Sequence, residues 1–173
     1  RKGYGGKATN NPPALKLRRA SKQPTTLISF RIADESDAAS VAILLEALFE
    51  EVEGSPDADE IAGIFGEMEA DDSHSTLLAL DDDEDIVGIL TIVECLPISA
   101  GGKYGVINEL YVVPEYRSEG VGKLLVQEAK DLAESRDWKR LEVTTPGDEF
   151  SKTLRFYERE GFYKIGPRYC YRS

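Results

Sequence analysis

The sequence predicts an α/β fold in which a mixed central sheet carries helices on both faces. Strand and helix patterns follow one another in the order β-α-α-β-β-β-α-β-α-β-β, and such alternation is typical of a layered α/β domain. The stretch over 105–113 is too apolar for an exposed edge strand. A chain of 173 residues with 41% hydrophobic content buries one core, so we expect a single domain.

Residues 1–26 differ in composition from the rest and predict a flexible basic arm before a domain over 27–173. The arm is rich in Gly, Pro, Asn and Lys and lacks apolar periodicity. An Arg-rich leader without acids is also typical of an organelle transit remnant. Residues 1–33 hold eight Lys or Arg and no acid, which leaves 13 basic and all 32 acidic residues, a net charge of −19, for the remainder. This charge repels nucleic acid and favours cationic partners, unless it is only a solubilising shell.

The first half of the domain is predicted to hold a strand, two helices and a hairpin of two strands. Acidic residues from Asp34 onward mark a helix start, and apolar residues at helical spacing follow. The acidic run over 81–85 indicates a solvated hairpin turn, because a calcium loop needs Gly at its sixth position, where Ile86 stands. The expected elements are a strand over 27–33, helices over 34–52 and 57–70, and strands over 75–80 and 85–96.

The second half is predicted to alternate strands and helices after a loop over 97–104. Its apolar stretches have the strand period, and its two amphipathic stretches have the helix period. The expected elements are strands over 105–113, 139–145, 162–166 and 168–172, and helices over 120–135 and 151–159.

The stretch "VVPEYRSEGVGKLL" at 112–125 ends a strand, turns, and begins a helix with two glycines. A helix start exposes unpaired N–H groups and the positive end of the dipole, and glycine lets a bulky anion approach the backbone. Gly120 and Gly122 therefore indicate a phosphate site, with charge from Arg117 and Lys123; an ordinary strand-to-helix turn fits the same letters. The Walker and dinucleotide patterns both fail in this stretch.

Other classes of chemistry find little support. Cys95 and Cys170 fit no metal-ligand spacing and indicate reduced packing residues, and His74, the single histidine, lies in a polar stretch typical of a surface loop. A mechanism with a Ser/His or Cys/His pair therefore lacks material, and no metal is expected. No apolar run has the length of a membrane span or the pattern of a secretory signal, so we expect a cytoplasmic protein without a membrane partner.

Two segments together carry a family resemblance. "INELYVVPEYRSEGVGKLLVQEA" resembles the acetyl-CoA-binding motif of the GCN5-related N-acetyltransferase (GNAT) superfamily, and "LRFYEREGFYKIG" resembles its closing segment. The resemblance covers 27–171, including the order of the helices, and says nothing of 1–26. It implies a mixed, mostly antiparallel sheet of six to seven strands with helices on both faces, and it implies acetyl-CoA as cosubstrate.

The resemblance also implies roles for single residues. Tyr157 matches the tyrosine that often protonates the departing thiolate. Phe150 departs from the family, which often has a cofactor-contacting Asn seven residues before that tyrosine, so this contact is missing or differently supplied. The implied CoA-binding residues are the strand beside the pantetheine arm, namely Leu110, Tyr111, Val112 and Val113, and the pyrophosphate turn, namely Arg117, Ser118, Glu119, Gly120, Val121 and Gly122, with Lys123 following.

The chemistry of amine acetylation makes a separate demand. A primary amine with a pKa near 10 is protonated at neutral pH, so a carboxylate or a water chain must take a proton. Glu109 lies on the strand where the thioester is expected, and the alternative for it is a strand carboxylate paired with a neighbour. Glu142 and Glu94 are weaker candidates. For Tyr157 the alternative is an aromatic packing residue on an amphipathic helix.

The sequence therefore predicts an N-acetyltransferase that moves acetyl from acetyl-CoA to a primary amine by direct attack in a ternary complex. The alternatives are a CoA-binding sensor without turnover, and an acyltransferase with another acyl donor or a hydroxyl acceptor. The acceptor is a small-molecule or protein amine, in a pocket expected to be lined by the first helices and the loop over 97–103. The terminal strand over 168–172 is suited to pairing in a homodimer.

Overall fold

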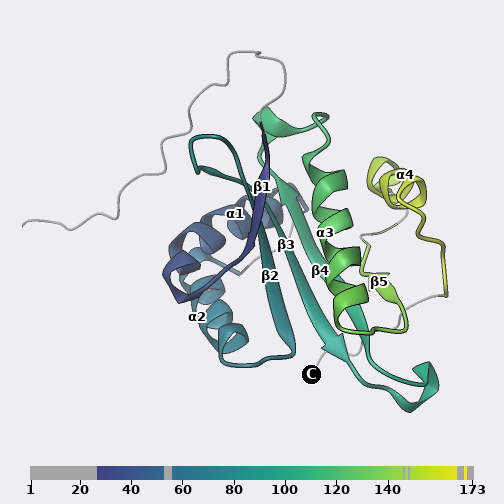
Figure 1. Cartoon of the computed structure of the whole chain (residues 1–173). Coiled ribbons are helices and arrows are strands. Elements are labelled where there is room, and N and C mark those ends of the chain that lie inside the picture. The colour runs from purple at the N-terminus through teal and green to yellow at the C-terminus, as the bar shows by residue number, and fades with distance from the viewer. Residues whose placement is uncertain (1–26, 53–55, 146, 148, 167–169, 171–173) are drawn as a thin grey trace, which may run out of the picture.

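A five-stranded sheet in the order β1-β2-β3-β4-β5 forms the centre of the protein (Figure 1). The computed structural model describes residues 27–52, 56–145, 147, 149–166 and 170. The first three strand pairings are antiparallel and the pairing of β4 with β5 is parallel, which confirms the mixed, mostly antiparallel sheet. The strands are β1 Ser29–Ile32, β2 His74–Leu80, β3 Ile86–Cys95, β4 Tyr104–Val112 and β5 Leu141–Val143.

The number of strands in the described part of the chain is lower than the six to seven expected. Residues 162–166 have the alternation of a strand but form none. Their side chains explain this: Tyr163 is 81% exposed and Ile165 is 64% exposed, so neither packs on a neighbouring strand. The expected arm over 1–26 and most of the expected strand over 168–172 lie outside the described residues.

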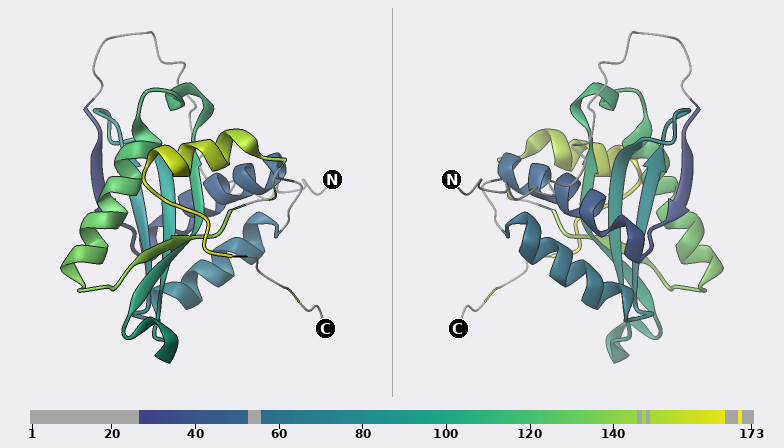
Figure 2. Two further views of the ribbon diagram at one scale, coloured as in Figure 1. Left: turned by 90° about the vertical axis from the view of Figure 1, so that its right-hand side faces the viewer. Right: turned by 90° about the vertical axis from the view of Figure 1, so that its left-hand side faces the viewer.

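The α1 and α2 helices cover one face of the sheet, α3 covers the opposite face, and α4 lies at the side of the sheet near β4 and β5 (Figure 1, Figure 2). The α1 and α2 helices pack against each other, and α3 packs against the central strands from the opposite face. In α1 and α3 the buried side chains recur three or four residues apart, which gives each helix one apolar stripe. The helices are α1 Ala38–Glu51, α2 Ala58–Glu69, α3 Val121–Ser135 and α4 Ser151–Arg159, close to their predicted bounds.

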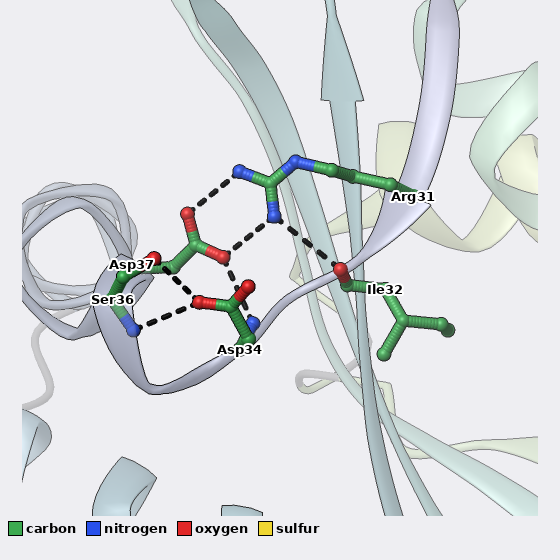
Figure 3. Close-up of polar contacts among 5 residues, drawn as sticks. All are labelled: Arg31, Ile32, Asp34, Ser36 and Asp37. Carbon is green, nitrogen blue, oxygen red and sulfur yellow. Dashed lines mark hydrogen bonds and ion pairs between the residues drawn. The ribbon is translucent and has the colours of Figure 1, made fainter.

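A polar cluster fixes the passage from β1 to α1 (Figure 3). Both guanidinium nitrogens of Arg31 donate to the Asp37 carboxylate, at 2.6 and 2.7 Å, and the backbone N–H of Asp34 donates to the same carboxylate at 2.9 Å. Asp34 in turn caps a short 3₁₀ turn, Glu35–Asp37, by accepting from the Ser36 N–H. The Arg31 hydrogen bonds hold the pKa of the buried Asp37 carboxyl below its ordinary value.

The acidic run between β2 and β3 is a hairpin turn, as predicted. One carboxylate oxygen of Asp81 accepts the N–H groups of Asp83 and Asp85, each at 3.0 Å, and the Asp81 N–H donates to the Asp85 carbonyl. The other oxygen accepts the hydroxyl of Tyr116, which lies in the 3₁₀ turn Pro114–Tyr116 before α3. The hairpin is thereby tied to the segment that leads into α3.

A close contact holds the start of β5 against β4. Gly105 on β4 faces the ring of Trp138, and a Cβ at this position would lie 2.2 Å from the Trp138 Cζ3 atom. The Trp138 Nε1 donates to Glu94 at 2.6 Å, so the ring is also anchored by a hydrogen bond. Only glycine fits here, and the two strands pair from Gly105 onward.

Candidate active site

The β4 strand contains a bulge in its middle. Ile107 faces Ile92 and Leu110 faces Leu90, so the two β4 residues Asn108 and Glu109 lie opposite the single β3 residue between those partners. A bulge of this kind bends its strand and increases the local twist. The bend lies where the pairing with β5 stops.

Beyond the bulge, β4 and β5 separate. Their register ends at Ile107 and Val143, and the Thr144 N–H makes a last bond of 2.8 Å to the Ile107 carbonyl. The Val113 N–H donates to β3, at the Val87 carbonyl. Because amides alternate in direction along a strand, the backbone groups of Leu110 and Val112 point to the side that β5 has left open. The Val112 carbonyl accepts the Arg117 Nε at 2.8 Å, and the Val112 N–H and the backbone groups of Leu110 face the cavity.

A cavity of about 1030 Å³ occupies the gap between the separated strands. It is lined by the end of α1, the bulged part of β4, the turn before α3, the residues after β5, and α4. Among the predicted site residues, those in its wall are Glu109, Leu110, Tyr111, Val112, Arg117, Ser118, Gly120, Gly122, Lys123 and Tyr157. Of the other three, Val113 and Val121 are buried in the core and Glu119 is exposed outside the cavity.

The start of α3 forms one end of this cavity. Gly120 has φ +92° and Ser118 has φ +66°, and this left-handed backbone turns the chain sharply into the helix. The first hydrogen bond of the helix runs from the Leu124 N–H to the Gly120 carbonyl at 3.0 Å. The N–H groups of the three residues between Gly120 and Leu124 therefore have no acceptor within the helix. Gly120, Gly122 and Lys123 are in the cavity wall, so this helix start presents free amides and the positive end of the dipole to the cavity, which suits an anion.

Gly122 lies closest to the other walls of the cavity. A Cβ there would be 3.6 Å from Phe156, 3.7 Å from Val112 and 3.8 Å from Leu110, all at ordinary contact distance. The glycine thus keeps open a narrow space between α3, α4 and β4. Apolar side chains line this space next to the free amides at the start of α3.

Arg117 connects the walls of the cavity. Its guanidinium forms an ion pair of 2.6 Å with Glu51 at the end of α1, and its Nε donates to the Val112 carbonyl at 2.8 Å. The same group lies 5.1 Å from the centre of the Tyr111 ring. These contacts fasten α1 to β4, and the expectation that Arg117 adds charge at the phosphate site stays a prediction.

Glu109 is half-buried and faces the α1 side of the sheet, as does Tyr111, whereas Leu110 and Val112 face α3. The hydroxyl of Thr91 donates to the Glu109 carboxylate, and the Glu109 N–H donates back to that hydroxyl at 3.2 Å. Burial raises the pKa of the Glu109 carboxyl above its ordinary value, and the Thr91 hydrogen bond opposes this shift. A carboxyl with a raised pKa is a stronger base once it is ionised.

Tyr157 lies on α4 with its side chain almost enclosed, 7% exposed. Its ring meets Phe156 and Phe162 edge to face, with centroid distances of 5.0 and 5.6 Å. Burial raises the pKa of the Tyr157 phenol, so the hydroxyl stays protonated at neutral pH and is a donor. The residue both packs and lines the cavity, so the two interpretations of the sequence are compatible.

The structure places the weaker candidates elsewhere. Glu94 binds Lys103 at 2.6 Å and the indole of Trp138, and Glu142 pairs with Arg140 at 2.6 Å; neither carboxylate lines the cavity. None of the residues over 97–103, which were expected to line the acceptor pocket, is in the wall of this cavity. The loop lies at the other end of β4 from the start of α3 (Figure 1), next to the chain that follows α3, where the Lys139 N–H donates to the Lys103 carbonyl at 2.8 Å.

Several residues of the cavity wall were not predicted individually. Leu48, Phe49 and Val52 at the end of α1 form an apolar part, and Phe150 occupies the position where the family often has Asn. Lys152 and Arg159 add positive charge from α4. Their spacing of seven residues on one helix face was the available signal, but the sequence did not show which surface this face meets.

The bulged strand, the open edge of β4 and the free helix start together form an anion site beside an open strand edge in a mixed α/β fold. The chain matches the acetyltransferase (GNAT) family over residues 39–162, well over half of its length. The protein therefore belongs to the GNAT family of acetyltransferases, and the resemblance drawn from the two motifs is confirmed.

Similar proteins agree with this assignment. The uncharacterized N-acetyltransferase YhfO of Bacillus subtilis (strain 168) is 26% identical over 135 residues, which cover 78% of this chain and 89% of that protein. The crystal structure of a ribosomal-protein-alanine N-acetyltransferase from Brucella melitensis biovar Abortus 2308 matches with a TM-score of 0.72 at 22% identity, over 85% of this chain and 99% of that one. The aminoglycoside N-acetyltransferase AAC(6')-Iy in complex with CoA matches with a TM-score of 0.73 at 16% identity, over 88% and 99%. The two structural matches support the fold.

Two further observations concern features outside the cavity. None of the helices in the described ranges is long and apolar enough to cross a membrane. Within the same ranges, no three His, Cys, Asp or Glu side chains gather in a group that could hold a metal ion.

Proposed function

We propose that the protein transfers the acetyl group of acetyl-CoA to a primary amine by direct attack in a ternary complex. The observation that carries this proposal is that one cavity is lined by a free helix start, an open strand edge, the Glu109 carboxylate and the Tyr157 phenol. The helix start serves as an anion site and the strand edge as a backbone template, while Glu109 serves as the base and Tyr157 as the acid in acetyl transfer to an amine.

The residues present fit CoA as the bound cosubstrate. The amides at the start of α3 are suited to the pyrophosphate, and the backbone of Leu110 and Val112 is suited to the amide groups of the pantetheine arm. Lys123, Lys152 and Arg159 line the same cavity and carry positive charge toward the phosphates. Phe150 offers no amide, so the cofactor contact that the family often makes at this position is absent here.

Proton transfers by this chain's own residues complete the reaction. The Glu109 carboxylate takes a proton from the ammonium form of the acceptor, directly or through water, and the free amine attacks the thioester carbonyl carbon. The carbon–nitrogen bond forms, the carbon–sulfur bond breaks, and the sulfur leaves as thiolate. Tyr157 gives this sulfur its phenolic proton and regains one from solvent, and the protonated amide nitrogen loses its extra proton to solvent.

The proposal is tested by two measurements on the full chain. Calorimetry with CoA and acetyl-CoA is expected to give micromolar dissociation constants. A panel of primary amines, containing a polyamine, an aminoglycoside, an amino acid and a peptide with a free N-terminus, is then assayed with acetyl-CoA for release of free thiol. Failure to bind either form of CoA contradicts the proposal. Binding without thiol release across the panel favours the alternative, a CoA-binding sensor.

A further inference from the structure

Thr91 is a polar residue in the middle of the apolar core. It lies on β3, the central strand of the sheet, and is 2% exposed. Its position in the register is the single residue opposite the bulge of β4. A buried hydroxyl must find hydrogen-bond partners or lower the stability of the fold, so its contacts identify its role.

Both hydrogen bonds of this hydroxyl go to one residue. Thr91 Oγ1 donates its proton to the Glu109 carboxylate and accepts the Glu109 N–H at 3.2 Å. The bulge removes the Glu109 N–H from the regular ladder, and the hydroxyl satisfies it. The single O–H donor of Thr91 is then directed at the Glu109 carboxylate. This hydrogen bond fixes the position of one carboxylate oxygen, and the other oxygen can accept a proton from a ligand.

We infer that Thr91 is a positioning residue that orients the Glu109 carboxylate toward the cavity and keeps it ionised for proton abstraction. This inference rests on the proposed function, in which Glu109 is the base. Thr91 acts through Glu109 and is not itself part of the cavity wall.

No cation in the described part of the chain takes over this role. Glu109 has no ion pair there, and its described side-chain hydrogen bond is the one from Thr91. That bond lowers the pKa of the carboxyl, against the effect of burial. The charged and titratable groups that line the cavity from the surrounding elements are Glu51, Tyr111, Tyr116, Arg117, Lys123, Glu149, Lys152, Tyr157, Arg159 and Glu160.

A matched control lies one strand away. Thr76 on β2 faces Thr91 directly in the register and is fully buried, but its hydroxyl has no hydrogen-bond partner among the described residues. Thr91→Val and Thr76→Val therefore make the same chemical change at neighbouring buried sites. Only the first removes a donor from Glu109.

The primary experiment needs no acceptor. The protein is labelled with ¹³Cδ-glutamate, the Glu109 signal is assigned by its loss in Glu109→Gln, and its pH titration is followed by NMR. In Thr91→Val the titration is expected to move to higher pH, because the ionised carboxylate has lost its donor. Thr91→Ser, which keeps the hydroxyl, and Thr76→Val are expected to titrate like the wild type. Should Thr91→Val fail to fold, Thr91→Ala replaces it.

Kinetics with the fastest amine of the panel provide the second measurement. In Thr91→Val the acid limb of the pH profile of kcat/KM is expected to move to higher pH, and kcat/KM on that limb is expected to fall about tenfold. The CoA affinity is expected to stay unchanged. Thr91→Ser is expected to restore the wild-type profile. In a Glu109→Gln background Thr91→Val is expected to leave turnover unchanged.

The outcomes separate this inference from the proposed function. If Glu109 titrates at the same pH in Thr91→Val as in the wild type, the positioning role is overturned, even if activity falls. Thr91 then only packs against the bulge. If the Glu109 titration moves in Thr91→Val but the pH profile of kcat/KM does not, Glu109 is not the base and Thr91 has no role in catalysis. CoA binding is not affected by this outcome.

Discussion

Gly122→Asp is expected to keep the fold intact and abolish CoA binding in the same variant. The backbone at this position is helical and a Cβ meets its neighbours at 3.6 to 3.8 Å, so the side chain enters without strain. A carboxylate in the first turn of a helix also interacts favourably with the dipole, by about 0.3–1 kcal/mol, and glycine is a poor helix former. The thermal midpoint is therefore expected to stay or rise.

The loss of CoA affinity follows from charge. A carboxylate about 5 Å from a phosphate charge costs roughly 3 kcal/mol at an effective dielectric constant near 20, which corresponds to more than 100-fold in the dissociation constant. Gly122→Ala separates size from charge and is expected to weaken binding less. Calorimetry with CoA and a thermal melt of each variant measure the two effects.

Gly63→Asp is the matched control for this experiment. Gly63 also lies in a helix, α2, with no atom within 4 Å of the position that a Cβ would take, and the substitution adds the same charge outside the cavity. Its CoA affinity is expected to equal that of the wild type. A dissociation constant for Gly122→Asp within about twofold of the wild type would refute the placement of the pyrophosphate at the start of α3.

Four other substitutions test the site and its support. Tyr157→Phe keeps the ring contacts and is expected to lower kcat by about 10- to 1000-fold with little change in CoA affinity; unchanged turnover returns the residue to a packing role. Glu109→Gln is expected to slow the reaction most where the amine is protonated, so its defect shrinks as pH rises; a defect independent of pH indicates substrate binding instead. Because burial raises the pKa of Glu109, ionisation of its carboxyl destabilises the fold as pH rises through that pKa. Urea unfolding of Glu109→Gln is therefore expected to give a higher free energy of unfolding than the wild type at neutral pH, and the difference is expected to vanish in acid. Asp37→Asn is expected to lower the free energy of unfolding by about 1–2 kcal/mol near neutral pH, where the lowered pKa keeps the Asp37 carboxylate charged beside Arg31. Once the pH falls below that pKa, the substitution is expected to have no effect on stability. A loss of stability that is constant across this pH range contradicts the ion pair. Gly105→Ala forces a Cβ into the indole of Trp138 and is expected to lower the free energy of unfolding by about 1–3 kcal/mol, which corresponds to several degrees in Tm. An unchanged Tm would contradict this close contact.

The helices and most strands could be predicted because their signals are local. The pattern over 151–159 has apolar residues on one face, and the structure has α4 at Ser151–Arg159. The start of α3 was predicted from two glycines and lies within one residue of the expected position. In both cases the spacing of neighbouring residues contains the information.

The features that the sequence did not reveal depend on distant partners. The bulge at Asn108 and Glu109 is a property of the register with β3, and its stabilising hydroxyl lies 18 residues from Glu109. The loop over 97–103 is not in the cavity wall, and loop composition does not show which end of a strand meets the start of the following helix. Residues 162–166 have strand alternation, but a strand also needs a neighbour, and alternation alone does not supply one.

The hydrogen bond between Tyr116 and Asp81 has a consequence for protein engineering. The β2–β3 hairpin is short, acidic and exposed at its tip, features of a loop that accepts insertions. Asp81, however, closes the hairpin with one carboxylate oxygen and holds Tyr116, just before the turn into α3, with the other. A peptide tag inserted between Asp82 and Asp83 would therefore strain a joint that reaches the cavity wall, because Tyr116 lines the cavity.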